Sequence, residues 1–118
     1  MAKAVGVGGI FLKARDPKAL SAWYATHLGI ESQYGGLVFD GPGAAGLTMF
    51  SHFPLETKYF GDESQQDMIN LRVDDLDQLV AQLAEAGVRI DPKRDDSDYG
   101  RFAWIWDLEG NRVELWQP

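Results

Sequence analysis

The feature that most limits the fold of this chain is a pattern that occurs twice. Each copy begins with an apolar segment, continues through an aspartate into apolar residues at helical spacing, and ends at a glycine. Laid over each other at one offset, the copies match at Leu12 and Leu71, Lys13 and Arg72, Asp16 and Asp75, and Leu20 and Leu79. Capped amphipathic helices often look alike, but these matches include the strand before each helix. The sequence therefore predicts two copies of one supersecondary unit.

The helix in each copy has clear start and stop signals. In the first copy, Asp16 is a good N-cap, Pro17 suits the first helical position, and Gly29 ends the helix. In the second, Asp75 followed by Gln78 resembles a capping box, and Gly87 ends the helix. The expected apolar faces consist of Leu20, Trp23, Tyr24 and Leu28 in the first helix and of Leu76, Leu79, Val80 and Leu83 in the second.

Extended segments with turn signals follow each helix. The expected strands are 31–34, 37–40 and 47–53 in the first half, with a turn at 40–46, and 88–90, 101–107 and 112–118 in the second half, with a polar loop at 91–100 and a turn at 109–111. We therefore expect an α+β fold of two βαβββ modules in one domain, 1–118. The modules are 1–53 and 68–118, joined by a linker or lid at 54–67 that carries Tyr59 and Phe60.

Composition excludes several classes of function. The 118-residue chain has a net charge of −7, which disfavours nucleic acid and anionic membranes as partners. It has no cysteine, so disulfides, thiolate nucleophiles and Cys-based zinc sites are excluded. The N-terminal segment lacks the features of a signal peptide, and no apolar run is long enough to span a bilayer. We expect a cytoplasmic protein.

Alternation along the strands divides the side chains into two faces. One set is apolar and suited to lie under the helices: Ile10, Leu12 and Ala14; Leu47 and Met49; Ile69, Leu71 and Val73; Val113 and Leu115. The other set mixes aromatic and polar residues: Gly9, Phe11 and Lys13; Thr48, Phe50 and His52; Met68, Asn70 and Arg72; Arg112, Glu114 and Trp116. This mixture favours a partly enclosed ligand face. A protein interface or a second core layer would have a similar composition, and the face of Trp104 and Trp106 stays open.

The repeated unit, the entry segment ARDPKALSAWYATHLGI and the closing DLEGNRVELW together resemble the vicinal oxygen chelate superfamily. This superfamily includes glyoxalase I, bleomycin-resistance proteins, fosfomycin-resistance enzymes and extradiol dioxygenases. The resemblance covers nearly the whole chain and implies that the two modules form a curved mixed sheet, a cup with the helices on its outer face. It also implies a homodimer, with the cup built either within one chain or across two.

In metal-dependent members the cup holds a divalent ion on four strands. The resemblance places these ligand positions on Gly9, Thr48, Met68 and Glu114. Glycine has no side chain, and methionine sulfur and a threonine hydroxyl are poor ligands for hard divalent ions. We therefore expect no metal and no cofactor. His27 is expected to be exposed near a helix C-terminus, and His52 lies too far along its strand to complete the set.

The favoured hypothesis is metal-independent binding of a small molecule, as in the bleomycin-resistance group, with a planar cation as the ligand class. The candidate ligand-binding residues are Phe11, Lys13, Thr48, Phe50, Asn70, Arg72, Trp104, Glu114 and Trp116. Lys13 matches a position where glyoxalase I often has an arginine for an anionic group, although Lys13 and Arg72 would look the same as surface cations. Three alternatives remain: a metal-dependent glyoxalase I-like lyase or dioxygenase, a metal-free enzyme with Glu114 as general base, and a non-catalytic dimeric interaction module.

Overall fold

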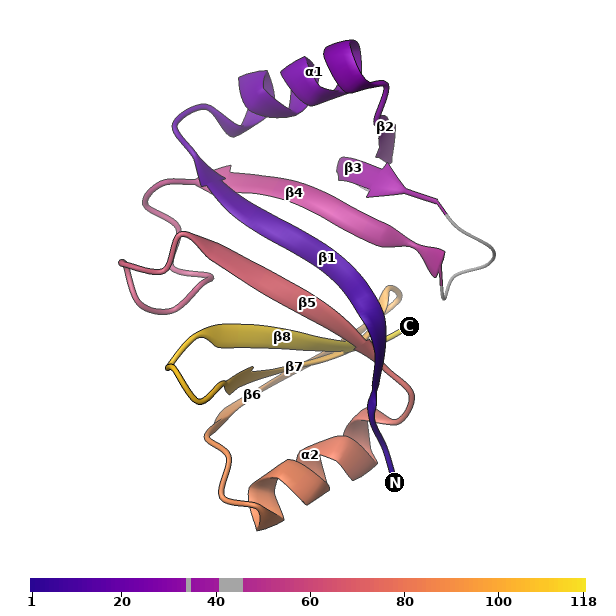
Figure 1. Ribbon diagram of the computed structural model, residues 1–118, viewed down its shortest axis with the longest axis vertical. Helices are drawn as coiled ribbons and strands as arrows, with labels where there is room; N and C mark the ends of the chain where they lie inside the picture. The colour runs from indigo at the N-terminus through magenta and orange to yellow at the C-terminus, as the bar shows by residue number, and fades with distance from the viewer. Residues whose placement is uncertain (34, 41–45) are drawn as a thin grey trace. The chain divides into compact units, whose positions relative to one another are not determined.

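The computed structural model describes residues 1–33, 35–40 and 46–118 (Figure 1). These residues form two compact units, which we call the N-terminal unit (9–68) and the C-terminal unit (1–8 and 69–118). The elements in chain order are β1 (Ala4–Ala14), α1 (Pro17–Leu28), β2 (Glu31–Gln33), β3 (Gly36–Phe39), β4 (Thr48–Pro54), β5 (Asp67–Val73), α2 (Leu76–Glu85), β6 (Ile90–Ser97), β7 (Gly100–Trp106) and β8 (Arg112–Gln117). No helix in these described ranges is long and apolar enough to cross a bilayer.

Both halves of the chain have the predicted strand–helix–three-strand order. In the first half, β1 pairs parallel with β4, while β2 with β3 and β3 with β4 pair antiparallel. In the second half, β5 pairs parallel with β8, while β6 with β7 and β7 with β8 pair antiparallel. The first and last strands of each half are thus neighbours, which confirms the α+β class. The expected turn at 40–46 and the end of the expected strand at 34 lie largely outside the described residues.

The helix signals have the same physical role in both halves. The Asp16 carboxylate accepts a hydrogen bond from the backbone N–H of Ala19 at 3.0 Å, and the Asp75 carboxylate accepts one from Gln78 at 3.1 Å. Gly29 has a φ of 67° and Gly87 a φ of 82°, a region that glycine enters without steric cost. Both helices therefore have an aspartate N-cap, and each ends with a positive-φ glycine, at the C-cap of α1 (Gly29) and one residue beyond the C-cap of α2 (Gly87).

The two helices differ in how they pack. In the C-terminal unit, the predicted stripe of α2 packs on one face of the sheet, with Leu76 and Leu79 buried. The remaining core residues of this unit are Ala2, Leu71, Val73, Val80, Leu83, Ala103, Ile105, Val113 and Leu115. Every residue of α1 is described and none is fully buried. Of its predicted apolar face, Trp23 is 51 % and Leu28 62 % exposed, so that prediction is only partly correct.

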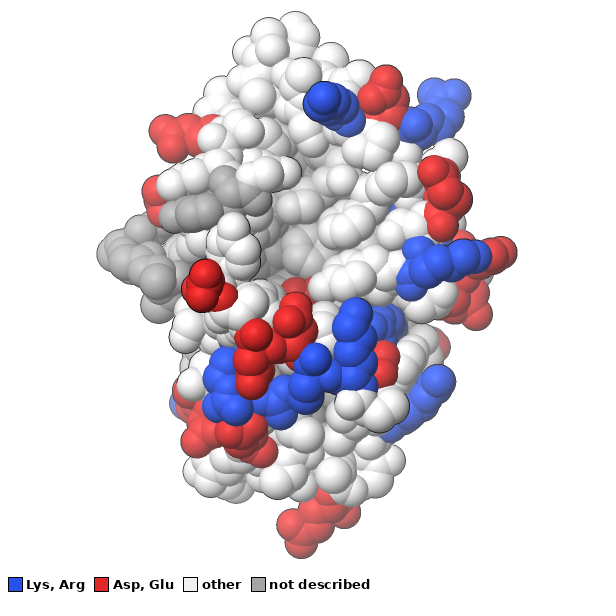
Figure 2. Space-filling view, turned by 180° about the vertical axis from the view of Figure 1, so that it is seen from behind, with Lys and Arg blue, Asp and Glu red and all other residues white. Residues whose placement is uncertain are grey.

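The polar segment expected to be a loop at 91–100 is a strand instead. β6 runs from Ile90 to Ser97 and pairs with β7 through Arg94↔Ala103 and Ser97↔Gly100. The strand is the last in the order of its unit and most of it is exposed, so it carries charges in place of an apolar alternation. On the face seen in Figure 2, positive and negative side chains lie side by side in one band.

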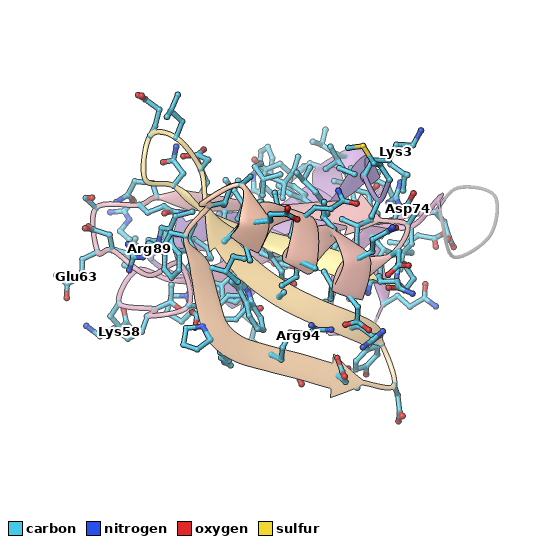
Figure 3. The ribbon with its side chains drawn as sticks, turned by 90° about the horizontal axis from the view of Figure 1, so that it is seen from below. Lys3, Lys58, Glu63, Asp74, Arg89 and Arg94 are labelled. Carbon is cyan, nitrogen blue, oxygen red and sulfur yellow. The ribbon has the colours of Figure 1, made fainter. Side chains whose placement is uncertain are left out.

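Polar contacts of the backbone fix the start of the chain to the C-terminal unit. The backbone N–H of Lys3 donates to the Asp74 carboxylate at 2.9 Å, and the two residues lie close together in Figure 3. The Gln82 side chain accepts from the N–H of Ala2 at 2.8 Å and donates to its carbonyl at 3.1 Å. These bonds place Ala2 in the core, where it is 5 % exposed.

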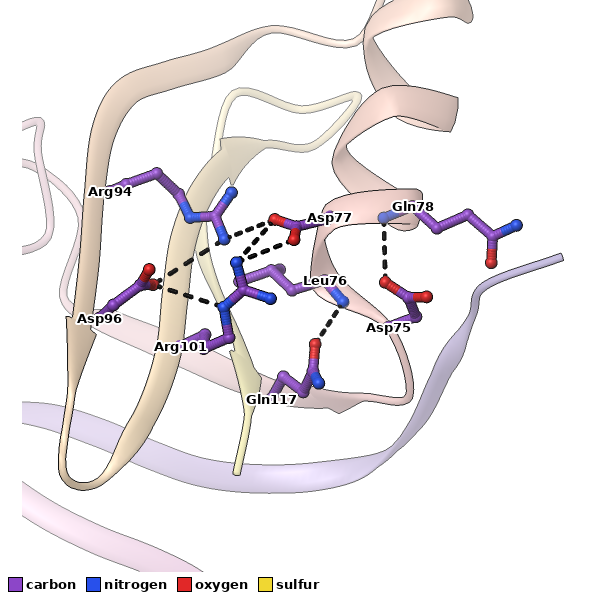
Figure 4. A network of polar contacts seen from close by, with 8 residues as sticks. All are labelled: Asp75, Leu76, Asp77, Gln78, Arg94, Asp96, Arg101 and Gln117. Atoms are coloured by element: carbon purple, nitrogen blue, oxygen red, sulfur yellow. Dashed lines mark hydrogen bonds and ion pairs between the residues drawn. The ribbon is translucent and has the colours of Figure 1, made fainter.

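A charged network ties the first turn of α2 to the β6–β7 hairpin (Figure 4). The Asp77 carboxylate pairs with Arg94 at 2.9 Å and with Arg101 at 2.8 Å, and Asp96 lies 3.7 Å from Arg101. The side chain of Gln117 accepts from the N–H of Leu76 at 2.7 Å. The hairpin and the last strand thus satisfy donors and charges at the N-terminus of α2.

Candidate functional site

The predicted ligand residues of the C-terminal unit lie on the sheet face opposite α2. Asn70, Glu114 and Trp104 are direct neighbours across β5, β8 and β7 and form one row. Arg72, Trp116 and Phe102 form the next row. Since Trp104 and Trp106 alternate with core residues Ala103 and Ile105, both indoles share the face of Glu114. This resolves the register that the sequence left open.

Glu114 is a buried carboxylate, 3 % exposed, and both of its oxygens accept hydrogen bonds. Oε1 accepts from Asn70 Nδ2 at 2.9 Å, and Oε2 accepts from Trp104 Nε1 at 3.3 Å. Burying a carboxylate is unfavourable unless donors replace the lost water, and Asn70 and Trp104 contribute two of them. Glu114 is therefore buried, whereas a glutamate in an ordinary surface hairpin would face solvent.

Asn70 and Gly8 fit together closely beside this carboxylate. Asn70 is 2 % exposed, and its Oδ1 has no hydrogen-bond partner among the residues that the structure describes. A Cβ at Gly8 would lie 2.2 Å from this Oδ1 and 2.8 Å from the Trp116 ring. Only glycine at position 8 leaves room for the orientation in which Asn70 donates to Glu114.

A series of cations and indoles occupies the other end of this face. The Arg112 guanidinium pairs with Asp91 at 2.7 Å and lies 5.3 Å from the ring centroids of both Trp104 and Trp106. Arg89 lies 3.8 Å over Trp106. The backbone N–H of Lys93, and then the Arg112 side chain, hold the pKa of the Asp91 carboxyl below its usual range. Sequence reasoning missed Asp91, because it was assigned to a loop.

Trp116 also has partners within its own unit. Its ring is parallel to that of Phe102, with centroids 6.0 Å apart, and its Nε1 donates to the Tyr99 carbonyl at 2.8 Å. Arg72 Nη1 donates to the Val7 carbonyl at 2.8 Å. Trp116 and Arg72 therefore share the predicted face, and both support its internal packing.

In the N-terminal unit, Phe11 and Lys13 contact the 54–67 segment. Phe11 packs on Phe53 at 5.5 Å, and Phe53 stacks on Tyr59 at 5.5 Å. Lys13 Nζ donates to the Glu63 carbonyl at 2.9 Å, and Phe60 is fully buried. Tyr59 and Phe60 thus anchor this segment to the face of β1 that carries Phe11 and Lys13.

The predicted face of β4 is wrong. Phe50 packs edge-on against Tyr24 of α1 at 4.9 Å, and His52 stacks on the same tyrosine at 5.4 Å. Thr48 alternates with Phe50 on this helix side, while Gly9 pairs with Met49 on the other. Both faces of this strand carry large apolar side chains, Met49 and Phe53 on one and Phe50 on the other, so alternation in the sequence could not show which set the helix covers. The structure therefore does not place Thr48 and Phe50 with Phe11.

His52 contacts helix α1 and does not point toward the face that carries Phe11 and Lys13. Its Nδ1 lies 2.9 Å from the Ser21 hydroxyl, and partial burial lowers the pKa of the imidazole below its usual 6.5. His27 is exposed in the last turn of α1, as expected, with its ring 4.9 Å from Trp23.

The donor set does not fit a divalent metal. Within residues 1–33, 35–40 and 46–118, no group of three or more His, Cys, Asp or Glu side chains lies close enough to share an ion. Both oxygens of Glu114 already accept hydrogen bonds, and Thr48 lies on the helix side of its strand. Divalent catalytic metals need about three protein ligands, and this set of residues does not supply them.

Comparison with known proteins decides the family. The profile of the glyoxalase-like domain matches residues 9–116. This chain belongs to the glyoxalase-like domain family. The match confirms the predicted membership of the vicinal oxygen chelate superfamily. No curated protein sequence matches the chain.

Solved structures of glyoxalase-like proteins have the same fold. Methylmalonyl-CoA epimerase from Mycobacterium tuberculosis is 21% identical with a TM-score of 0.67, covering 98% of this chain and 89% of that one. A variant of the Streptomyces coelicolor epimerase in complex with 2-nitronate-propionyl-CoA is 16% identical with a TM-score of 0.72, covering 96% of both chains. A glyoxalase/bleomycin resistance protein/dioxygenase superfamily member from Vibrio splendidus 12B01 is 16% identical with a TM-score of 0.61, covering 100% of both chains. At these identities the similarity shows the fold alone.

Proposed function

We propose that this glyoxalase-like protein binds a small organic molecule, without a metal ion, on the face that carries Glu114. The observation that carries the proposal is the buried carboxylate with its two neutral donors, Asn70 and Trp104. A buried carboxyl group among aromatic rings is a rare and unfavourable arrangement for packing alone. It is a common arrangement where a ligand is oriented by one or two polar groups.

The carboxylate favours a ligand that donates hydrogen bonds and carries positive charge. An ionised carboxylate can only accept hydrogen bonds, and the Glu114 carboxylate accepts them from Asn70 and Trp104. Within the unit, Arg112 and Lys93 already lie over the Trp104 ring, at 5.3 and 5.1 Å. This face thus already accommodates cations beside an indole, and we propose a planar organic cation as the ligand class.

A thermal shift experiment with two matched probes tests this proposal. 9-Aminoacridine is a planar cation, and acridine-9-carboxylate has the same rings with a negative charge. We expect 9-aminoacridine to raise the Tm of the wild-type protein, because a ligand that binds only the folded state stabilises it. Glu114→Gln should give a much smaller shift at the same probe concentration. Glu109→Gln, in the exposed turn before β8, is the matched control and should retain it.

Two outcomes would refute the proposal. One is stabilisation of the wild-type protein by the anionic probe alone. The other is an equal shift by 9-aminoacridine in the Glu114→Gln variant. Elemental analysis of protein purified without chelator tests the metal separately, since a stoichiometric divalent ion would contradict the donor set described here.

Proton transfer to and from a carbon acid is the second candidate function. A buried carboxylate is suited to act as a general base, and methylmalonyl-CoA epimerases share the fold. If Glu114 acts this way, the protein should exchange the C2 proton of methylmalonyl-CoA for deuterium in D₂O, and Glu114→Gln should stop the exchange. Equal exchange in both proteins would exclude Glu114 as the base.

A further inference from the structure

A groove beside the first turn of α1 is distinct from the face that carries Glu114. It has a volume of about 750 Å³, within the range of small-molecule sites. Its lining includes Arg15, Asp16, Leu20, Trp23, Tyr24 and Leu55, and all of its lining residues belong to the N-terminal unit. No residue of the Glu114 network contributes to it.

Trp23 provides an aromatic surface in this groove. Trp23 is 51 % exposed, although Trp is usually well covered in a folded protein. Its orientation is held by an edge-on contact with Tyr24 at 5.2 Å and by the His27 ring at 4.9 Å. Tyr24 in turn stacks on His52 of β4. The exposed ring is thus fixed to the sheet and ready to stack on a planar ligand.

Arg15 is the cation available to a ligand here. Among the described residues, its guanidinium makes no hydrogen bond or ion pair. The other charged side chains of the lining are already engaged. Lys13 donates to the Glu63 carbonyl, and the Asp16 carboxylate accepts from the N–H of Ala19. A guanidinium binds a carboxylate through two parallel hydrogen bonds.

We propose that this groove binds an aromatic carboxylate. The ring would stack on Trp23 beside the apolar side chains of Leu20 and Leu55, and the carboxylate would pair with Arg15. This site is independent of the proposed function, because it uses the opposite ligand charge and different residues.

Titration followed by NMR tests the proposal on the whole chain. The indole N–H resonances of the four tryptophans report where a ligand binds, and Trp23→Leu identifies the resonance of Trp23. We use 2-naphthoate as the probe and 2-naphthalenemethanol as its neutral counterpart. Naphthoate should shift the Trp23 resonance in a saturable way, and the alcohol should bind about fivefold more weakly.

Two variants separate the contribution of the Arg15 charge to binding from that of the Trp23 ring. Arg15→Gln should weaken naphthoate binding about fivefold, and Trp23→Leu should weaken it about tenfold. Lys18→Gln removes an exposed cation in the first turn of α1 that does not line the groove, and it should leave the affinity unchanged. Glu114→Gln should also leave it unchanged, which separates this site from the proposed function.

The proposal is overturned if naphthoate leaves the Trp23 resonance unmoved. It is also overturned if the alcohol binds as tightly as the acid, or if Arg15→Gln and Lys18→Gln have equal effects. If a variant fails to fold, the comparison of the acid with the alcohol on the wild-type protein still tests the proposal.

Discussion

At the scale of single residues, the burial of Glu114 depends on its neighbours in the same row. Asn70 and Trp104 each donate one hydrogen bond to the carboxylate. Asn70 can reach it because Gly8 has no Cβ. The polar network therefore depends on an adjacent glycine as well as on its own donors and acceptor, and a change at Gly8 should disturb all of it.

Gly8→Ala should destabilise the protein by about 1–3 kcal/mol, the usual effect of forcing a methyl group into a filled space. The new Cβ would lie 2.2 Å from Asn70 Oδ1. Gly6→Ala is the matched control, because its nearest contact at 2.6 Å is the end of the flexible Arg72 side chain. Urea unfolding should show the larger loss for Gly8→Ala. Equal losses would mean that Asn70 moves aside without penalty.

His52 should make stability depend on pH. Burial lowers the pKa of its imidazole below 6.5 in the folded protein, so the unfolded chain binds the proton more readily. The contribution of neutral His52 is complete above pH 6.5 and declines as pH falls below that value. Urea unfolding at decreasing pH should therefore show a steeper loss for the wild-type protein than for His52→Gln. Parallel curves would contradict this account.

At the scale of elements, the helix caps were predictable from the sequence, but the face of each strand that a helix covers was only partly predictable. Asp16, Asp75, Gly29 and Gly87 act through local backbone geometry, which the sequence contains directly. The helix-covered face of β5 and β8 was predictable at Leu71, Val73, Val113 and Leu115, whose positions alternate with polar ones. Ile69 was also expected there and is 37 % exposed.

Two strands lacked this local signal. In β4 both faces carry apolar side chains, and the choice between them is made by Tyr24 and Ser21 of α1. Edge strand β6 is stabilised by pairing with β7 and by ion pairs to Asp77, so its own sequence resembles a loop. Both outcomes depend on partners distant in sequence.

The segment between β4 and β5 should depend on Lys13 for its order. Lys13 Nζ binds the Glu63 carbonyl at 2.9 Å, and the Lys13 N–H binds the Gln66 carbonyl at 3.1 Å. Lys13→Met removes the first bond and keeps most of the apolar stem. Amide hydrogen exchange at 62–66 should accelerate about fivefold, as expected for a lost hydrogen bond of about 1 kcal/mol. Lys58→Met removes only the exposed pair with Glu63 (Figure 3) and should have little effect; a larger effect than Lys13→Met would contradict this assignment.

At the scale of the whole molecule, we expect a homodimer. The C-terminal unit exposes the apolar side chains of Val5, Val7 and Ile69 by 54 %, 44 % and 37 %. Light scattering should give twice the mass of one chain, and Val7→Lys should lower it. Leu108→Lys, at a turn residue that is 99 % exposed, is the control and should not. A monomeric wild-type protein would contradict the expectation.

Calorimetric titration of 9-aminoacridine into chelator-treated protein tests the central claim most directly. We predict a single saturable site in the wild-type protein. The Glu114→Gln variant should bind at least about tenfold more weakly, because a charge-assisted hydrogen bond is lost. Binding that appears only after a divalent metal is added, or that is equally tight in Glu114→Gln, would contradict a metal-independent site built on this carboxylate.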